Sequence, residues 1–303
     1  MTFLIVLLTA GAIGILALAA LILLPFLGGF LLVRVMEILT PLCLVLWFLL
    51  HGRKNAPGWE KFRGVRFAHR GLHGPGVPEN SLAAFRRAAA AGYGAELDVR
   101  LTKDGRLAVI HDSDLTRMCG RSGFVEELTA AELSAYRLAG SGEGVPFLEQ
   151  VLPLFEGKKS LIVELKTARG NHAALAAAAV ECLDRFQTDC CVESFDPRCL
   201  VWLRRHRPEI LRGQLTRNFL KEGTGRSLWQ CLALTTLLCN WKTRPDFVAC
   251  RFEDRRGCAP ALWRWWGGKL AYWTIRSPRD LRETERAGAL PIFEGFVPEE
   301  ESR

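Results

Sequence analysis

The sequence predicts an α/β protein, a closed (β/α)8 barrel with a small insertion, preceded by an N-terminal transmembrane helical hairpin. Residues 3–33 carry no charged side chain. From Val65 onward, short β-branched runs alternate with longer helical stretches, which is typical of a parallel sheet covered by helices. The 303 residues accommodate one such barrel and an anchor, and a composition of 49% hydrophobic and 24% charged residues excludes a disordered chain.

The apolar N-terminal segment predicts two membrane spans. Its charge-free stretch exceeds the ~20 residues that one spanning helix needs, and a second apolar run covers 38–50. Pro25, Gly28 and Gly29 weaken the helix, so we expect spans at about 3–24 and 30–50, within an anchor of residues 1–52. Arg34 and Glu37 lie one helical turn apart and can pair or extend to the lipid headgroups. The alternative is a single tilted span with an interfacial helix.

Charge distribution predicts a cell-membrane protein whose remaining domain is cytoplasmic. Arg53, Lys54, Lys61 and Arg63 follow the second apolar run, and this end should stay inside by the positive-inside rule. The net charge of +8 suits anionic lipid surfaces or phosphorylated substrates, and no zinc-finger spacing or Arg-rich run indicates nucleic acid. Ten irregularly spaced cysteines without a CxxC motif favour reduced thiols.

The soluble part, residues 63–298, predicts eight parallel strands. Helices are expected over 81–91, 171–186 and 278–287. The strands are expected to end near His69, Asp98, Glu164, Ser194, Leu215, Cys250, Thr274 and Glu294. Eight such strands close into a barrel, and their carboxyl ends form the mouth where barrel enzymes hold their chemistry.

A further strand, 107–111, follows too closely for a parallel crossover and must return as a hairpin. A two-residue turn at Asp104–Gly105 would make paired residue numbers sum to 209, which places Asp98 opposite His111. Glu96 shares that face by alternation, so two carboxylates and an imidazole should converge.

Residues 113–158 are too long for a loop and predict an insertion that forms a lid or wall at the mouth. Within it, Thr129 and Glu132 form a capping box for a helix near 129–137.

Several ordered motifs over residues 65–296 carry a resemblance to a known family. They are Phe67-Ala68-His69-Arg70-Gly71, Pro78-Glu79-Asn80-Ser81, Glu96-Leu97-Asp98-Val99, His111-Asp112, Val163-Glu164-Leu165-Lys166, Ser194-Phe195 and Trp273-Thr274. With them the chain resembles the glycerophosphodiester phosphodiesterase family. Two sites depart from the family pattern: Arg276 replaces an Asn, and Phe293-Glu294-Gly295 replaces a Thr-Asp pair. Arg276 can reach an anionic headgroup or form a salt bridge with Glu294.

Three acids at two strand ends, Glu96, Asp98 and Glu164, offer hard oxygen ligands. Such ligands suit one divalent cation, Mg²⁺ or Ca²⁺, and the resemblance implies the same three metal ligands. The alternative is an ion-pair layer with three cations of the mouth, Arg70, Arg100 and Lys166.

Two histidines at strand ends, His69 and His111, can serve as general base and general acid, and the resemblance assigns them these catalytic roles without saying which is which. Substrate binding is expected from Arg70 and Lys166, which supply positive charge for phosphoryl oxygens. The resemblance places Glu79 and Asn80 at the site rim, although helix capping before Ser81 explains them as well. Trp273 walls the pocket or fills the core.

These residues predict a metal-dependent phosphodiesterase that hydrolyses glycerophosphodiesters to glycerol 3-phosphate and an alcohol beside a lipid bilayer. The anchor and an apolar stretch at 228–241 keep a lysophospholipase D or sphingomyelinase-D-like activity open. A non-catalytic, membrane-tethered phospholipid-binding module is the third possibility. The preferred headgroup, the choice of cation and the oligomeric state do not follow from the residues.

Overall fold

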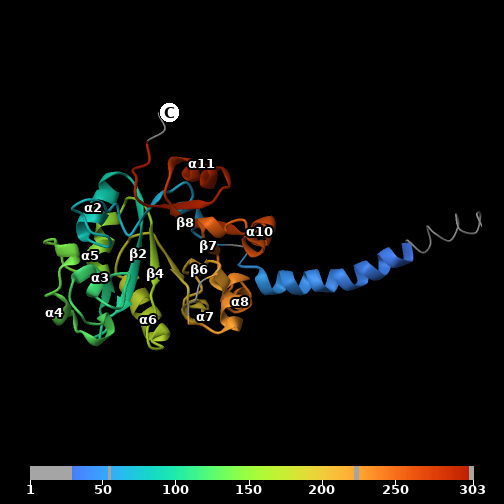
Figure 1. Cartoon of the computed structure of the whole chain (residues 1–303), viewed down its shortest axis with the longest axis horizontal. Helices are drawn as coiled ribbons and strands as arrows, with labels where there is room; N and C mark the ends of the chain where they lie inside the picture. Colours follow the sequence, from blue (N-terminus) through green and yellow to red (C-terminus); the bar gives the residue numbers. More distant parts are fainter. Residues whose placement is uncertain (1–28, 54–55, 222–224, 300–303) are drawn as a thin grey trace, which may run out of the picture. The chain divides into compact units, whose positions relative to one another are not determined.

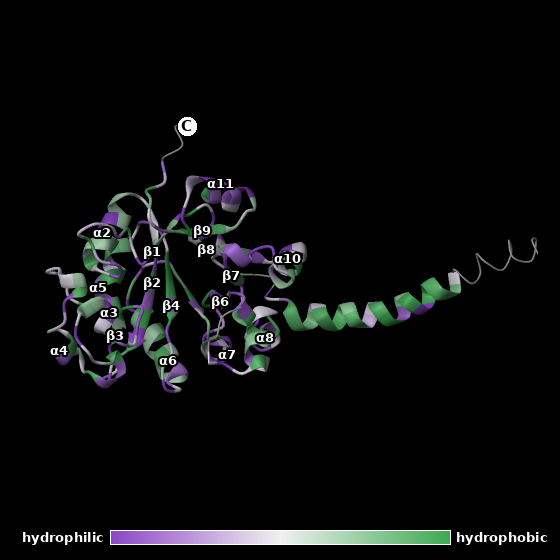
Figure 2. Cartoon of the chain, viewed as in Figure 1, coloured by the Kyte–Doolittle hydropathy of each residue, from purple (hydrophilic) through white to green (hydrophobic). Residues whose placement is uncertain are grey.

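The computed structural model describes residues 29–53, 56–221 and 225–299, and the chain divides into two compact units, Met1–Leu49 and Leu50–Arg303. One helix, Gly29–Leu50, has 22 residues with a mean hydropathy of 2.0, which is long and apolar enough to cross a membrane (Figure 2). Arg34 Nη1 and Glu37 Oε2 lie 2.7 Å apart on it, which confirms the expected pair. The span expected at 3–24 lies outside the described residues, so the hairpin is not tested; among the described residues one helix is long and apolar enough to cross a membrane.

The second unit contains a closed barrel of eight parallel strands, as predicted (Figure 1). The barrel strands are β1 Phe67–His69, β2 Gly94–Leu101, β4 Leu161–Leu165, β5 Cys190–Ser194, β6 Arg212–Thr216, β7 Phe247–Arg251, β8 Lys269–Ile275 and β9 Leu290–Phe293. Each strand pairs with the next in chain order, and β9 pairs with β1 to close the ring. Closure places the eight carboxyl ends around one mouth.

Side-chain alternation fills the barrel with apolar residues below that mouth. Phe67, Ile162, Leu215 and Phe247 belong to one buried cluster. The 3₁₀ helix η1, Trp59–Lys61, closes the lower end, and its Trp59 packs on Phe247 with ring centroids 5.5 Å apart. Because apolar side chains occupy the lower layers, the inward-facing polar residues are confined to the carboxyl ends of the strands.

The helices between the strands cover the barrel. They are α2 Leu82–Ala90, α3 Thr116–Cys119, α4 Ala130–Leu133, α5 Leu148–Val151, α6 His172–Leu183, α7 Pro197–His206, α8 Leu228–Thr235, α9 Asn240–Thr243, α10 Cys258–Trp265 and α11 Pro278–Arg286. Further 3₁₀ helices are η2 Val125–Glu127, η3 Leu138–Gly140, η4 Leu152–Phe155, η5 Phe219–Lys221 and η6 Phe252–Asp254. The three helices predicted by residue range are α2, α6 and α11. Ser81 caps α2, since its Oγ accepts a hydrogen bond from Ala84 N at 3.1 Å.

The predicted register of the hairpin is wrong by one residue. Strand β3, Leu107–Val109, pairs with β2 so that Val99 faces Val109 and Leu101 faces Leu107, and the paired numbers sum to 208. The turn has three residues rather than two, with Gly105 in the left-handed region at φ 80°, a conformation that glycine adopts readily. Asp98 therefore does not lie opposite His111, which follows the end of β3.

Residues 113–158 build a small hydrophobic cluster around Leu115, Val125, Leu133 and Leu138, which also includes Ala108 and Ile110. The capping box of Thr129 and Glu132 is present, but α4 ends at Leu133, four residues short of the prediction. None of the residues that line the two cavities described below comes from this segment.

Candidate active site

The strand register brings the predicted acids together at the mouth. His69 pairs with Glu96 between β1 and β2, and Asp98 pairs with Glu164 between β2 and β4. One carboxylate oxygen from each of Glu96, Asp98 and Glu164 lies within 4.8 Å of the other two. All three residues are buried. The predicted ligand set is thus a compact cluster that could hold a cation.

A fourth acid, Glu193, was not predicted. It stands directly beside Glu164 in the β4–β5 register and is 1% exposed, and its Oε2 has no hydrogen-bond partner among the residues that the structure describes. Alternation along β5 could have indicated Glu193, because it lies on the same face of the strand as the motif residue Phe195. Which of the two faces of β5 turns inward follows only from the closed sheet.

Two cations offset part of this negative charge. Lys166 Nζ lies 2.7 Å from Glu164 Oε1 and 3.2 Å from Asp98 Oδ1, and Arg70 Nε lies 3.3 Å from Asp98 Oδ2. Arg100 is placed elsewhere: it donates to the His111 carbonyl and pairs with Glu126. Of the three cations proposed for an ion-pair layer, two therefore contact the acids.

The pKa values of the acids are pushed in opposite directions. Burial raises the pKa of Glu96 well above its usual range, and the carboxylates of Asp98 and Glu164 raise it further. Burial also raises the pKa of Glu164 to about 7. For Asp98, burial is outweighed by Lys166 and Arg70, which hold its pKa well below the usual range. Such separation indicates a site short of positive charge.

Each predicted catalytic histidine has a carboxylate at its Nδ1. His69 Nδ1 lies 3.2 Å from Glu294 Oε2, and His111 Nδ1 lies 2.7 Å from Asp112 Oδ1. Burial lowers the pKa of both histidines, while the carboxylates oppose this effect. With Nδ1 held in this way, Nε2 of each ring is the atom left for proton transfer.

Glu294 has a role that the sequence did not reveal. It follows β9, and β9 pairs with β1, so closure of the ring sets Glu294 beside His69. Arg276 Nη2 pairs with the same Oε2 atom at 3.0 Å, which is the salt bridge that the sequence left open. Contacts with His69 and then with His73, whose Nε2 lies 3.5 Å from Glu294 Oε1, hold the pKa of Glu294 well below its usual range, and the charge of Arg276 adds to this effect.

Glu79 and Asn80 support the site from behind. Glu79 accepts from Arg70 Nη1 at 2.8 Å and also pairs with Arg117. Asn80 Nδ2 donates to Asp98 Oδ2 at 2.9 Å, and Asn80 is 1% exposed. Capping belongs to Ser81, so these two residues orient Arg70 and Asp98.

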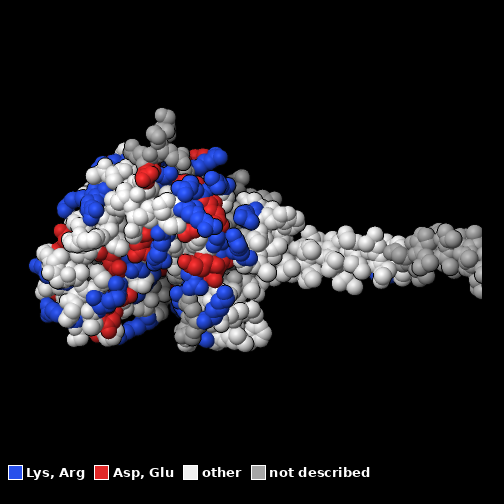
Figure 3. Space-filling view, turned by 45° about the horizontal axis from the view of Figure 1, so that its top comes forward, with Lys and Arg blue, Asp and Glu red and all other residues white. Residues whose placement is uncertain are grey.

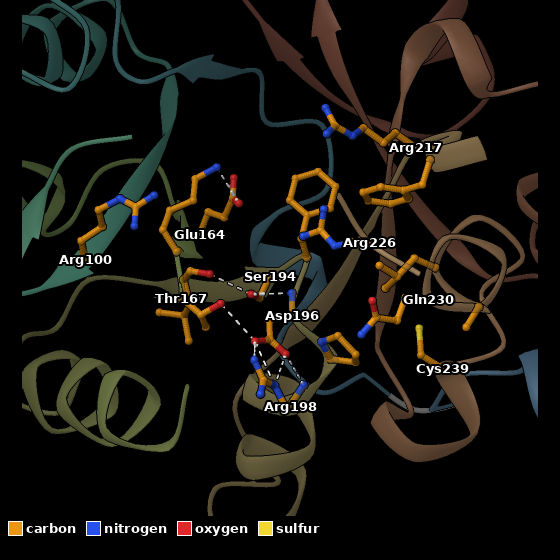
Figure 4. Close-up of a pocket in the computed structure, with 17 residues that line it drawn as sticks. Arg100, Glu164, Thr167, Ser194, Asp196, Arg198, Arg217, Arg226, Gln230 and Cys239 are labelled. Atoms are coloured by element: carbon orange, nitrogen blue, oxygen red, sulfur yellow. Dashed lines mark hydrogen bonds and ion pairs between the residues drawn. The ribbon is translucent and has the colours of Figure 1, made fainter. Parts of the chain in front are cut away.

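Two adjoining cavities meet at this mouth. The first, of about 250 Å³, is lined by both histidines, by Glu96, Glu164 and Glu193 and by Trp273. The second, of about 540 Å³, shares Glu164, Lys166, Phe195 and Arg217 with it and extends between α7 and α8 (Figure 4). Trp273 packs edge-on against Phe195 with centroids 5.6 Å apart.

The second cavity combines basic and apolar walls. Arg217 stacks over the rings of Phe195 and Phe219, and Arg226 also stacks over Phe219. Asp196 binds Arg198 and Thr167, as the dashed lines of Figure 4 show. We call this second cavity the groove. It can accept an amphiphilic group that is attached to a phosphate held at the mouth.

Comparison with known proteins identifies the relatives of the chain. Residues 69–248 match the model of the Glycerophosphoryl diester phosphodiesterase family. A glycerophosphodiester phosphodiesterase of Caldanaerobacter subterraneus is 30% identical over 232 residues, 73% of this chain and 89% of the relative. A lysophospholipase D of Rattus norvegicus is 32% identical over 150 residues, 45% of this chain and 44% of the relative.

The fold is likewise shared with solved structures. A phosphodiesterase of Oleispira antarctica in complex with the product sn-glycerol-3-phosphate superposes with a TM-score of 0.64 at 24% identity, over 77% of this chain and 94% of that one.

Proposed function

This chain belongs to the glycerophosphoryl diester phosphodiesterase family, as its motifs indicated, and we propose that it hydrolyses glycerophosphodiesters to glycerol 3-phosphate and an alcohol. The observation that carries the proposal is the cluster of Glu96, Asp98 and Glu164 beside two histidines whose Nδ1 atoms are held by carboxylates. Carboxylates for a cation and imidazoles for protons are what phosphodiester cleavage needs.

A divalent cation fits these residues. Among the described residues, four buried acids gather at the mouth, and the ion pairs that reach this cluster come from Arg70 and Lys166. The raised pKa values of Glu96 and Glu164 indicate that the cluster needs further positive charge. Glu96, Asp98 and Glu164 would hold Mg²⁺ or Ca²⁺, since every donor is a hard oxygen. When bound, the ion supplies positive charge that polarises the phosphoryl group.

The remaining residues bind the substrate and move protons. Arg70 and Lys166 are placed to contact the phosphoryl oxygens, and Trp273 walls the cavity for the glycerol moiety. One histidine Nε2 accepts the proton of the attacking hydroxyl, and the other donates a proton to the leaving alkoxide. The attacking group is water, which gives glycerol 3-phosphate directly, or the neighbouring hydroxyl of the substrate, in which case a water molecule then opens the resulting cyclic phosphate to the same product.

The test is metal-dependent release of glycerol 3-phosphate from glycerophosphocholine by the purified full chain. His69→Ala and His111→Ala should each lower kcat/KM by ~10²–10⁴. A glycerophosphodiester with a p-nitrophenol leaving group separates the roles, because such a good leaving group needs no acid. The variant that recovers activity on it has lost the acid. Binding of phospholipid without any release would instead favour the non-catalytic module.

A second candidate, lysophospholipase D activity, is favoured by the groove. Phe219, Ala233 and Leu234 give it apolar walls beside the mouth, which suit the acyl-bearing side of a lysophospholipid. A lysophospholipase D among the relatives supports this substrate class. Comparing kcat/KM for glycerophosphocholine and lysophosphatidylcholine decides which diester is preferred.

Membrane attachment completes the proposal. The anchor of residues 1–52, which includes the helix Gly29–Leu50, holds the chain in the cell membrane. The barrel domain of residues 63–298 lies on the cytoplasmic side. Protease added to sealed, inside-out vesicles should digest the barrel, whereas protease outside intact cells should not.

A further inference from the structure

Exposed hydrophobic side chains of the barrel unit gather in one sector. In residues 50–299, as far as the structure describes them, the exposed large hydrophobics are Phe124, Leu220, Leu228, Trp229, Trp241, Trp265 and Val297. Five of these seven lie between β6 and β8, on η5, α8, α9 and α10. We call this group of elements the β6–β8 sector. Leu228, Trp229 and Trp265 are 71%, 77% and 78% exposed, far beyond what a helix packed only on its own barrel requires.

The apolar N-terminal segment ends at the same sector. The Leu50 carbonyl accepts from Asn240 Nδ2 of α9 at 3.0 Å, and Arg53 N donates to the Pro245 carbonyl at 3.0 Å. Between them, Gly52 is so closely packed that a Cβ there would lie 2.3 Å from the ring of Trp263 in α10. The chain therefore leaves the proposed membrane span directly onto α9 and α10.

The charged side chains of the sector are basic. Residues 225–245 and 255–279 contain no Asp or Glu, while Arg226, Lys242 and Arg264 accompany the exposed Leu and Trp side chains. Figure 3 shows that on the visible face of the barrel unit Lys and Arg are mostly interspersed with Asp and Glu. Tryptophan next to basic residues, with acids excluded, is the pattern of surfaces that sit at the headgroup level of anionic membranes.

We propose that the β6–β8 sector is a lipid-docking surface, with Leu228, Trp229, Trp241 and Trp265 at the headgroup level of the bilayer and basic side chains on anionic lipids. The proposal rests on the helix Gly29–Leu50 being the membrane anchor, since the chain that follows this helix, residues 50–53, packs on α9 and α10 of this sector. A second copy of the chain would set like charges against each other here, because the charged residues of α8, α9 and α10 are all basic.

Docking by this sector brings the groove to the lipid. Leu228 and Trp229 begin α8, and Gln230 and Leu234 of the same helix line the groove that joins the catalytic mouth. A substrate residing in the bilayer can then enter along α8, whereas a water-soluble glycerophosphodiester can enter from any side.

The first experiment measures lipid contact without catalysis. The full chain is reconstituted in nanodiscs of phosphatidylcholine and phosphatidylglycerol, with and without brominated acyl chains, and the quenched fraction of tryptophan fluorescence is recorded. Trp229→Phe and Trp265→Phe should each lower the quenched fraction, while Trp59→Phe, a change at the buried barrel floor, should raise it. Unchanged quenching in both surface variants, or a stable dimer that buries them instead, would overturn the proposal.

The second experiment uses turnover. The double variant Leu228→Ser, Trp229→Ser should lower hydrolysis of nanodisc-embedded lysophospholipid by about tenfold and leave hydrolysis of glycerophosphocholine unchanged. Phe124→Ser, an exposed aromatic on the insertion, should change neither. Equal effects on both substrates would contradict docking. If no diester is hydrolysed, the proposed function fails, and the quenching experiment still decides the docking surface.

Discussion

Replacing Glu164 by Gln should stabilise the metal-free protein and abolish its stabilisation by a divalent cation. Glu164 is 6% exposed and stands in a cluster with Glu96 and Asp98. Its partner Lys166 keeps an ion pair with Asp98 at 3.2 Å after the change, so no cation is left alone. Gln retains the shape of the side chain and removes one negative charge.

The sign and size of this change in stability follow from the raised pKa of Glu164. Glu164 has a pKa of about 7 in the folded chain and about 4.5 when unfolded, so the folded state binds its proton more tightly. Below pH 4.5 both states are protonated and nothing is lost. Between pH 4.5 and 7 the metal-free protein loses stability as the pH rises, and above pH 7 the loss is complete at about 3 kcal/mol. Gln cannot ionise and escapes this loss.

The assay is thermal unfolding of the full chain in detergent with a chelator, at pH 5 and pH 8. At pH 8 the variant should unfold about 6–12 °C above the parent, and near pH 5 the difference should fall to about a quarter of that. Saturating Mg²⁺ should raise the Tm of the parent and not of the variant. Glu60→Gln, an exposed acid, is the control. A variant no more stable than the parent at pH 8 would refute the reasoning.

Three further outcomes are expected. Glu294→Gln weakens a hydrogen bond that raises the pKa of His69, so the limb of the kcat/KM–pH profile that belongs to His69 should move to lower pH. An unmoved profile would show that this contact does not tune the site. Gly71→Ala should lower the free energy of unfolding by about 1–3 kcal/mol, because φ is +79° and the new Cβ would lie 2.8 Å from a side-chain carbon of α2; Gly105→Ala, with open space around it, should lose less. Glu193→Gln removes a buried negative charge beside the acid cluster, so calorimetric titration should find Mg²⁺ binding weaker by about tenfold. Unchanged affinity would show that this acid is too far from the ion to attract it.

Local sequence patterns were sufficient where one strand or helix carried the information. The alternation of short β-branched runs and helical stretches predicted eight parallel strands, and motif residues at their ends were placed at the mouth because parallel strands share a carboxyl edge. Ser81 and Thr129 indicated the starts of their helices, because a capping hydrogen bond involves only the next three residues. Composition alone indicated that residues 30–50 form an apolar helix.

Only the tertiary structure decided the contacts that need the ring to close. Residues 69 and 294 are 225 positions apart, and the pairing of β9 with β1 alone makes Glu294 the partner of His69. Glu193 became a neighbour of Glu164 through the β4–β5 register, and the hairpin register depended on one extra turn residue. Periodicity specifies which side chains share a face of a strand, but register and closure are set by the packing of the whole sheet, which no single segment encodes.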